Sequence, residues 1–400
     1  MPRPWRLQVF PAGAESVARP HFPIRSVNMP FTALSNVRQR MVVGQALPFN
    51  VRDHDRSLLL ARGQVIQSED QLAALLERGA LVDLDELLSP RERARQVART
   101  ELPRMWHEGL ARVGTVLVDP RGQSFRTALD DASDAVLGLV ERDPDLAIFQ
   151  ILTREANADV AYGAQRALHT AICAHLVGQR LGWDTATLER AFKVALTMNL
   201  SMLELQGELA RQRAAPTPTQ RAELLTHPMR SVEILMQAGV GDDDWLQAVA
   251  RHHEQEDGNG YPSGRSDVGE IASLVRRAEI YTAKLASRSH REALLADQAG
   301  RQMFMQDPGH PMIAALVKEF GIYPPGCLVR LKGGELGIVV ARGPTVTTPI
   351  VACFTTVSGA KLATPRRVDT AESRHAVQAV VGDRAGGFCM PLERLLSSLG

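Results

Sequence analysis

The sequence has 400 residues, enough for about two or three domains, with 44% hydrophobic and 23% charged residues as in ordinary globular proteins. Its 46 basic and 45 acidic side chains leave a net charge of +1 without long like-charge runs, so we expect no nucleic-acid partner. No apolar stretch approaches the roughly 18–20 residues of a membrane span. The four cysteines are scattered, so we expect reduced thiols in a cytoplasmic protein.

The first 33 residues are predicted to form a flexible extension. Six prolines lie between Met1 and Pro30, and the apolar region of a signal peptide is missing. A translation start at Met29 instead of Met1 remains open from the sequence.

A small β-rich module is predicted over residues 34–88. Short apolar runs at 41–43, 47–51 and 58–60 are separated by turn residues, as in short strands. Ser68 is a predicted N-cap of a helix over 71–78 that stops at Gly79. Residues 89–126 are charged and helical in pattern, and we expect a connecting helix with one solvated face.

Residues 127–322 have the pattern of an all-α bundle. The expected helices cover residues 131–141, 146–154, 161–181, 187–205, 219–237 and 245–253. Gly182 follows the third of these, where a helix C-terminus favours glycine. Asp242 to Asp244 are interpreted as an N-cap and acidic first turn, and His175 as a surface residue or a hydrogen-bonded core residue.

Residues 323–400 are predicted to form a small β extension and a tail. Strands are expected at 327–331, 336–341 and 350–354, with a hairpin turn at 332–335. The fold class is therefore mainly α, a helical bundle with a small β-rich module at the N-terminus and a small β extension at the C-terminus.

The most informative segment begins with two adjacent histidines, His252 and His253, at the end of an apolar helix. Their imidazoles point about 100° apart on a helix, so they can reach neighbouring ligand positions. The loop that follows contains Gly258 and Gly260, which permit close backbone approach, and ends at Pro262.

This segment resembles the HHExxDGxGYP signature of HD-GYP proteins. All specified positions are matched, by His252, His253, Glu254, Asp257, Gly258, Gly260, Tyr261 and Pro262. The resemblance implies a helical fold of the HD superfamily over about residues 161–318. It also implies hydrolysis of cyclic di-GMP by water activated on a bi- or trinuclear iron or manganese centre.

The resemblance assigns further positions one by one. His169 matches the first metal histidine, and Gln165 one turn earlier replaces the Glu ligand of trinuclear members. His227 matches the histidine of an HPxxG-like segment, and Glu279 matches a late Asp ligand. Arg288 matches an arginine that would contact phosphate.

The family's LLHDIGK segment is altered in this chain. Met198 replaces the ligand His, Asn199 the ligand Asp, and Met202 the Lys. A thioether binds iron or manganese weakly, and a neutral amide cannot bridge two cations as a carboxylate does. Glu279 is the remaining acidic ligand and is one methylene longer than Asp. No catalytic residue is therefore assigned.

The predicted function is a catalytically degenerate HD-GYP protein that acts in cyclic-dinucleotide signalling as a binding or protein-interaction module. The alternative is an active phosphodiesterase with one divalent metal, iron or manganese, on His227, His252 and His253 with His169 or Glu279 nearby. A purely structural domain without metal is a third interpretation. Cyclic di-GMP or a related dinucleotide, a protein at the GYP loop (residues 254–262) and a second copy in a homodimer are the partners considered.

Overall fold

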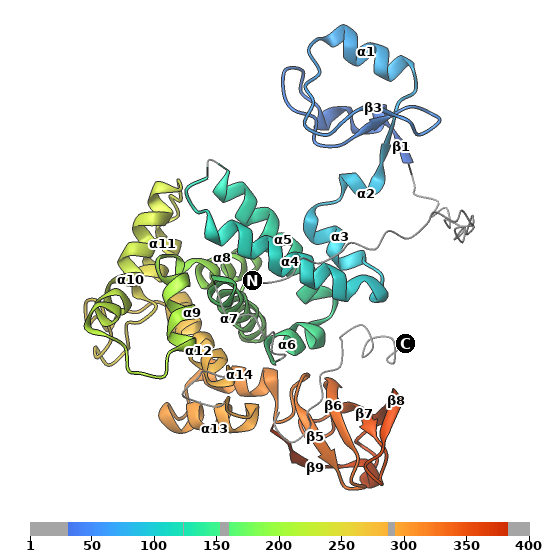
Figure 1. The fold of residues 1–400 in the computed structure, drawn as a ribbon. Helices are drawn as coiled ribbons and strands as arrows, with labels where there is room; N and C mark the ends of the chain where they lie inside the picture. The colour runs from blue at the N-terminus through green and yellow to red at the C-terminus, as the bar shows by residue number, and fades with distance from the viewer. Residues whose placement is uncertain (1–30, 123, 153–159, 287–292, 383–400) are drawn as a thin grey trace, which may run out of the picture. The chain divides into compact units, whose positions relative to one another are not determined.

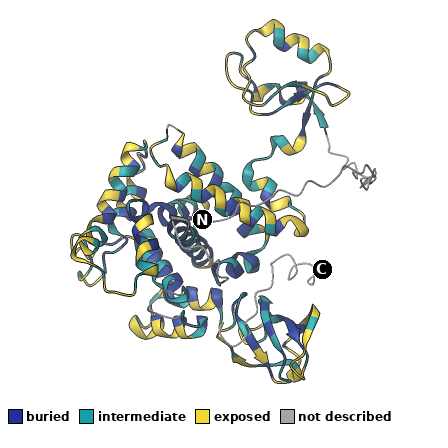
Figure 2. Ribbon diagram, viewed as in Figure 1, coloured by how far each residue is buried: buried dark blue, intermediate teal, exposed yellow. Residues whose placement is uncertain are grey.

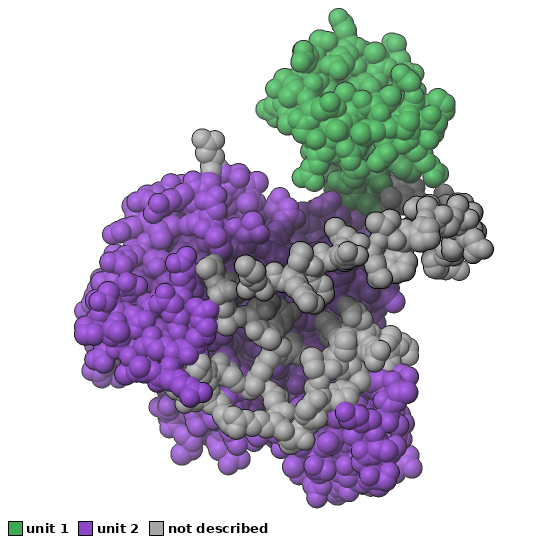
Figure 3. Space-filling model, viewed as in Figure 1, with its two compact units in different colours: residues 1–87 green, residues 88–400 purple. Residues whose placement is uncertain are grey.

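The computed structural model describes residues 31–122, 124–152, 160–286 and 293–382. The described chain forms two compact units that divide between Leu87 and Leu88 (Figure 3). Among these described residues, no helix has both the length and the apolar composition needed to cross a lipid bilayer.

The first unit contains a four-stranded antiparallel sheet in the order β1-β4-β2-β3. Its elements are β1 (Phe31–Ala33), a 3-10 helix (Leu34–Arg40), β2 (Val51–Arg52), β3 (Leu58–Leu60), α1 (Glu69–Glu77), β4 (Leu81–Asp83) and α2 (Leu84–Leu87). Apolar residues around Phe49 form its core. The predicted N-cap is confirmed, since the Ser68 hydroxyl accepts a hydrogen bond from the Gln71 amide.

The predicted strand at 41–43 is wrong, and of the strand predicted at 47–51 only Val51 lies in a strand, β2. The runs at 41–43 and 47–49 are irregular, because Met41, Leu47 and Phe49 pack their side chains into the core from turns instead of pairing in the sheet. The strand at 58–60 is confirmed, and Gly79 ends the helix region with a positive φ of 70°.

The predicted connecting helix over 89–126 has a different structure. It consists of α3 (Pro90–Gln96), a 3-10 helix (Arg99–Glu101) and α4 (Leu102–Val118). Trp106, Val113 and Leu117 form one buried face of α4 and belong to the main hydrophobic core. Since this spacing is the amphipathic helical period, α4 packs on the helices that follow instead of linking two bodies.

The second unit is mainly helical, which confirms the predicted fold class (Figure 1). After α4 come α5 (Phe125–Arg142), α6 (Pro144–Leu152), α7 (Val160–Leu181), α8 (Thr185–Thr197), α9 (Leu203–Arg211), α10 (Pro218–Gln237), α11 (Asp243–Arg251), α12 (Glu270–Leu285), α13 (Ala296–Gln306) and α14 (Pro311–Phe320). Gly182 has the positive φ expected of a residue after a helix end.

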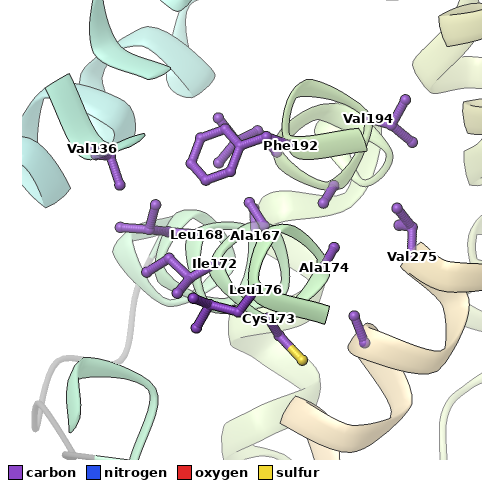
Figure 4. Close-up of a cluster of buried hydrophobic side chains, with 14 of the residues drawn as sticks. Val136, Ala167, Leu168, Ile172, Cys173, Ala174, Leu176, Phe192, Val194 and Val275 are labelled. Atoms are coloured by element: carbon purple, nitrogen blue, oxygen red, sulfur yellow. The ribbon is translucent and has the colours of Figure 1, made fainter. Parts of the chain in front are cut away.

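Helix α7 is the centre of this unit and is buried along most of its length (Figure 2). Leu168, Ile172 and Leu176 point toward neighbouring helices in the core, as Figure 4 shows. Because α7 is apolar on nearly every side between residues 167 and 177, helices α4, α8, α9, α12 and α14 all pack against it.

The single helix predicted over 187–205 is interrupted. Helix α8 ends at Thr197, a 3-10 turn covers Leu200–Met202, and α9 then begins. The Trp245 indole donates a hydrogen bond of 2.9 Å to the Thr197 hydroxyl and holds the end of α8 to α11. Asn199 therefore lies at a break between two helices.

The C-terminal β extension is confirmed and is larger than predicted. Its five-stranded antiparallel sheet has the order β8-β7-β6-β5-β9. The strands are β5 (Leu328–Leu331), β6 (Leu336–Ala341), β7 (Ile350–Thr355), β8 (Lys361–Asp369) and β9 (Val377–Val380), and the last two were not predicted. Arg342 joins the sheet to the helices through ion pairs with Asp145 and Glu319.

Candidate functional site

Three histidines, one from the interior of α10 and two from the C-terminal end of α11, form a compact cluster. His227 lies within α10, His252 caps the C-terminus of α11, and His253 follows it. One ring nitrogen from each lies within 4.8 Å of the others. Within the described ranges this is the one such group of three or more metal-ligating side chains, and His169 is outside it.

The hydrogen bonds of the two buried histidines define their tautomers. Nδ1 of His227 donates to the Leu224 carbonyl at 2.7 Å, and Nδ1 of His252 donates to the Val249 carbonyl at 2.6 Å. Each neutral ring then carries a lone pair on Nε2, and these two Nε2 atoms lie 3.0 Å apart. Burial lowers the pKa of both rings, which disfavours a proton between them.

A cation bound by both Nε2 atoms would remove this repulsion. Neighbouring ligands about 2.1 Å from an octahedral ion lie roughly 3 Å apart, which matches the observed separation. Nδ1 hydrogen bonds to carbonyl groups are also the usual support of metal-binding histidines. The three imidazoles therefore fit one divalent metal, and His227, His252 and His253 would hold it.

The carboxylate of Glu279 reaches the edge of this cluster from α12. Its Oε2 lies 3.9 Å from His253 Nε2, while its Oε1 accepts a hydrogen bond of 2.8 Å from Asn199 Nδ2. The Asn199 Oδ1 atom is buried and has no hydrogen-bond partner among the described residues. Since a carboxylate only accepts, the amide nitrogen must face Glu279 and the oxygen must face away.

The other two altered positions at the α8–α9 break, Met198 and Met202, have buried side chains. Met198 is completely buried and belongs to the main hydrophobic core, and Met202 is also buried. The break thus provides one amide and two thioethers. A second cation would find no carboxylate there.

Arg166 of α7 contacts the site by donating a hydrogen bond of 3.5 Å to the Glu279 carbonyl. His169 is half-buried, and burial with the nearby charge of Arg166 lowers its pKa to about 3. Arg166 donates to the Thr282 hydroxyl at 3.1 Å and so holds α7 against α12. Gln165 is half-buried on α7, and Arg288 lies outside the described residues.

The GYP loop is closed by its own side chains. The buried Glu254 carboxylate accepts hydrogen bonds from the amides of Ser263 and Arg265, at 2.7 and 3.0 Å. Asp257 accepts from the Asn259 amide at 2.9 Å in a tight turn. Glu254 thus ties the start of the loop to the segment that follows it, and both of its carboxylate oxygens accept hydrogen bonds there.

Tyr261 places the loop against the histidines. Its ring stacks on His253 with centroids 4.6 Å apart and an interplanar angle of 18°. Burial lowers the pKa of His253 to about 3, because it removes the charged form from water. Electrostatic interactions with His227 and Arg276 lower it further. His253 is therefore neutral and able to bind a cation.

Gly260 is required by the closure of the loop. A Cβ atom there would lie 2.4 Å from the Gln255 amide nitrogen and from the Glu254 Cα, which real structures do not permit. We expect Gly260→Ala to destabilise the second unit by about 1–3 kcal/mol, as overpacking does. Thermal unfolding measures this, and Gly241→Ala is the control because its Cβ meets nothing within 4 Å. Equal melting temperatures for the two variants would contradict the role of Gly260.

The prediction for His175 is wrong. It is fully buried, and neither ring nitrogen has a hydrogen-bond partner among the described residues. Its ring meets Phe192 edge-on, and burial lowers its pKa to about 4. It therefore packs as a neutral apolar side chain. The predicted N-cap at Asp242 is confirmed, since its carboxylate accepts from the Trp245 amide at 3.0 Å.

Two arginines on α12 were missed by the sequence interpretation. Arg277 is buried and pairs with Glu256 at 2.9 Å and Asp307 at 2.8 Å, while Arg276 is half-buried. The available signal was two adjacent cations in the middle of a helix whose residues over 271–281 are mostly apolar.

Two comparisons with known proteins find similar sequences. Residues 150–306 match a family model described as HD domain. Over 243 residues the chain is 26% identical to the cyclic di-GMP phosphodiesterase PA4108 of Pseudomonas aeruginosa, spanning 58% of this chain and 57% of that protein. The helical unit thus contains an HD domain.

The loop signature indicates which kind of HD domain this is. The complete HHExxDGxGYP string at the histidine cluster, together with these two matches, supports an HD-GYP family assignment. A structural comparison with Bd1817, described as an HDG"Y"P protein from Bdellovibrio bacteriovorus, gives a TM-score of 0.46 at 15% identity, over 72% of this chain and 97% of that one. So low a score adds nothing to the assignment.

Proposed function

We propose that this chain is a catalytically degenerate HD-GYP protein that binds cyclic di-GMP or a related dinucleotide. It would act in cyclic-dinucleotide signalling as a binding or protein-interaction module. The relative from Pseudomonas aeruginosa is a cyclic di-GMP phosphodiesterase, which supports the ligand class. The observation that carries the loss of catalysis is the α8–α9 break, where Met198 is buried in the core and Asn199 donates to Glu279.

Charge balance supports the loss of a multinuclear centre. Two divalent cations about 4 Å apart repel strongly and need bridging carboxylates. Glu279 is the carboxylate that reaches the histidine cluster, and one of its oxygens is engaged by Asn199. At Asn199 itself, an amide oxygen without charge takes the place of a bridging ligand.

The alternative function is hydrolysis on a single metal. The facing Nε2 atoms of His227 and His252 favour this alternative, because a bound cation would satisfy both lone pairs. Iron or manganese on the three histidines, with Glu279 beside them, would polarise a phosphoryl oxygen and lower the pKa of a bound water. His253 would be held in place by its stack on Tyr261.

One set of measurements on the purified full chain tests both functions. Metal content after loading with Mn²⁺ or Fe²⁺ is measured by elemental analysis, hydrolysis of cyclic di-GMP by product analysis, and binding by calorimetry. We expect at most one metal per chain, binding heat and no turnover. Two or more metals with turnover would contradict the proposal, and one metal with turnover would favour the alternative. Absence of heat at high ligand concentration would leave only a protein-interaction role.

A further inference from the structure

A cavity of about 490 Å³ opens at the GYP loop, which follows the histidine cluster in the chain. Its lining comes from Gln255, Glu256 and Asp257 of the GYP loop, from Arg276 and Arg277 of α12, and from the region of α13 and α14. This volume lies in the range of small-molecule sites. Arg276 connects the cavity to the cluster, because it lies one helical turn before Glu279 on α12 and its charge acts on His253.

The two arginines of this cavity differ in their partners. Arg277 forms ion pairs with Glu256 and Asp307 through its two terminal nitrogens. Arg276 is half-buried and forms no hydrogen bond or ion pair with any described residue, and burial lowers its pKa. Glu256, Asp257 and Asp307 attract the Arg276 guanidinium from a distance without hydrogen-bonding to it. Because removing its N–H groups from water without hydrogen-bond acceptors is unfavourable, acceptor atoms of a ligand would stabilise it.

The charges of the cavity argue against a phosphate group as that ligand. Glu256, Asp257 and Asp307 exceed the two arginines by one negative charge. A neutral group that offers acceptors to Arg276 and donors to a carboxylate fits better. The exposed Asp257 carboxylate accepts from Asn259 and still has lone pairs available.

Guanine has this pattern of donors and acceptors. Its O6 and N7 atoms accept the two parallel donors of a guanidinium, which is the commonest specific contact of arginine with a base. Its N1–H and N2–H groups point along the adjacent edge and suit a carboxylate. Ile280, Met303 and Ile313 provide apolar surface in the same cavity for the faces of the base.

We propose that this cavity binds a guanine base of the dinucleotide, with Arg276 donating to O6 and N7 and Asp257 accepting from N1–H and N2–H. The proposal rests on the proposed function, since it identifies the base that a dinucleotide-binding chain selects. Adenine offers an acceptor and a donor on the edge facing Arg276, so cyclic di-AMP is the poorer ligand.

Calorimetry of the full chain with cyclic di-GMP, cyclic di-AMP and GMP tests this. We expect cyclic di-GMP to bind at least about 10-fold more tightly than cyclic di-AMP, and Arg276→Gln to weaken cyclic di-GMP by about 10–100-fold. Arg276→Lys should not restore binding, because lysine keeps the charge and loses the paired donors. Arg301→Gln, exposed on α13, is the matched control with unchanged affinity.

Each outcome separates this inference from the proposed function. Equal affinity for the two dinucleotides, an unaffected Arg276→Gln variant, or full rescue by Arg276→Lys would overturn the guanine site and leave dinucleotide binding intact. Arg276-dependent binding of GMP without dinucleotide binding would refute the proposed function and keep the guanine site. Binding of none of the three ligands would overturn both. Thermal unfolding confirms that each variant is folded.

Discussion

A chain that carries Met198→His, Asn199→Asp and Met202→Lys is expected to bind about two divalent metals instead of at most one. The Asp would give a bridging carboxylate at the break where Asn199 now donates to Glu279, and the His would add an imidazole beside it. The Lys would add a charge for a phosphate group. Elemental analysis after loading with Mn²⁺ or Fe²⁺ measures the metal, and product analysis measures hydrolysis of cyclic di-GMP.

Matched controls separate metal binding from repacking of the core. Met198→Leu with Met202→Leu keeps the buried positions apolar and should leave the metal content unchanged. The triple variant with His252→Ala added should lose the gain. If the triple variant unfolds with the melting temperature of the natural chain and binds no additional metal, the α8–α9 break is not what prevents a second cation.

Removing the imidazole of His252 is expected to abolish metal-dependent stabilisation. A metal at 100 times its Kd stabilises the folded state by about 2.7 kcal/mol, so Mn²⁺ should raise the melting temperature of the natural chain and a chelator should lower it. His252→Ala should weaken metal affinity by about 100-fold or more, since even supporting residues of metal ligands contribute 10–100-fold. Differential scanning calorimetry across a metal titration measures both.

His107→Ala is the control for this experiment, because His107 is exposed on α4 and far in sequence from the cluster. It should keep the full metal-dependent shift. A natural chain whose melting temperature is the same with Mn²⁺ and with chelator would show that the facing Nε2 atoms of His227 and His252 hold no cation.

Features that depend on neighbours in the chain were predictable. The N-caps at Ser68 and Asp242 bond to amides three residues later, so short-range spacing is sufficient to identify them. The irregular runs around Met41 and Phe49 were predicted as strands. Their apolar side chains pack into the core of the first unit, but their backbone does not pair in the sheet.

The sequence by itself indicated the HD-GYP assignment, through the string from His252 to Pro262, and showed that Met198 and Asn199 stand in place of the family's His-Asp pair. Tertiary structure alone decided which side chains meet. His227 and His252 come from two helices, and Asn199 and Glu279 are 80 residues apart in the chain. Such contacts follow from how helices pack around α7, which no local pattern specifies. For the same reason only the packed structure reveals that Arg277 is paired and that Arg276, its neighbour, faces a cavity.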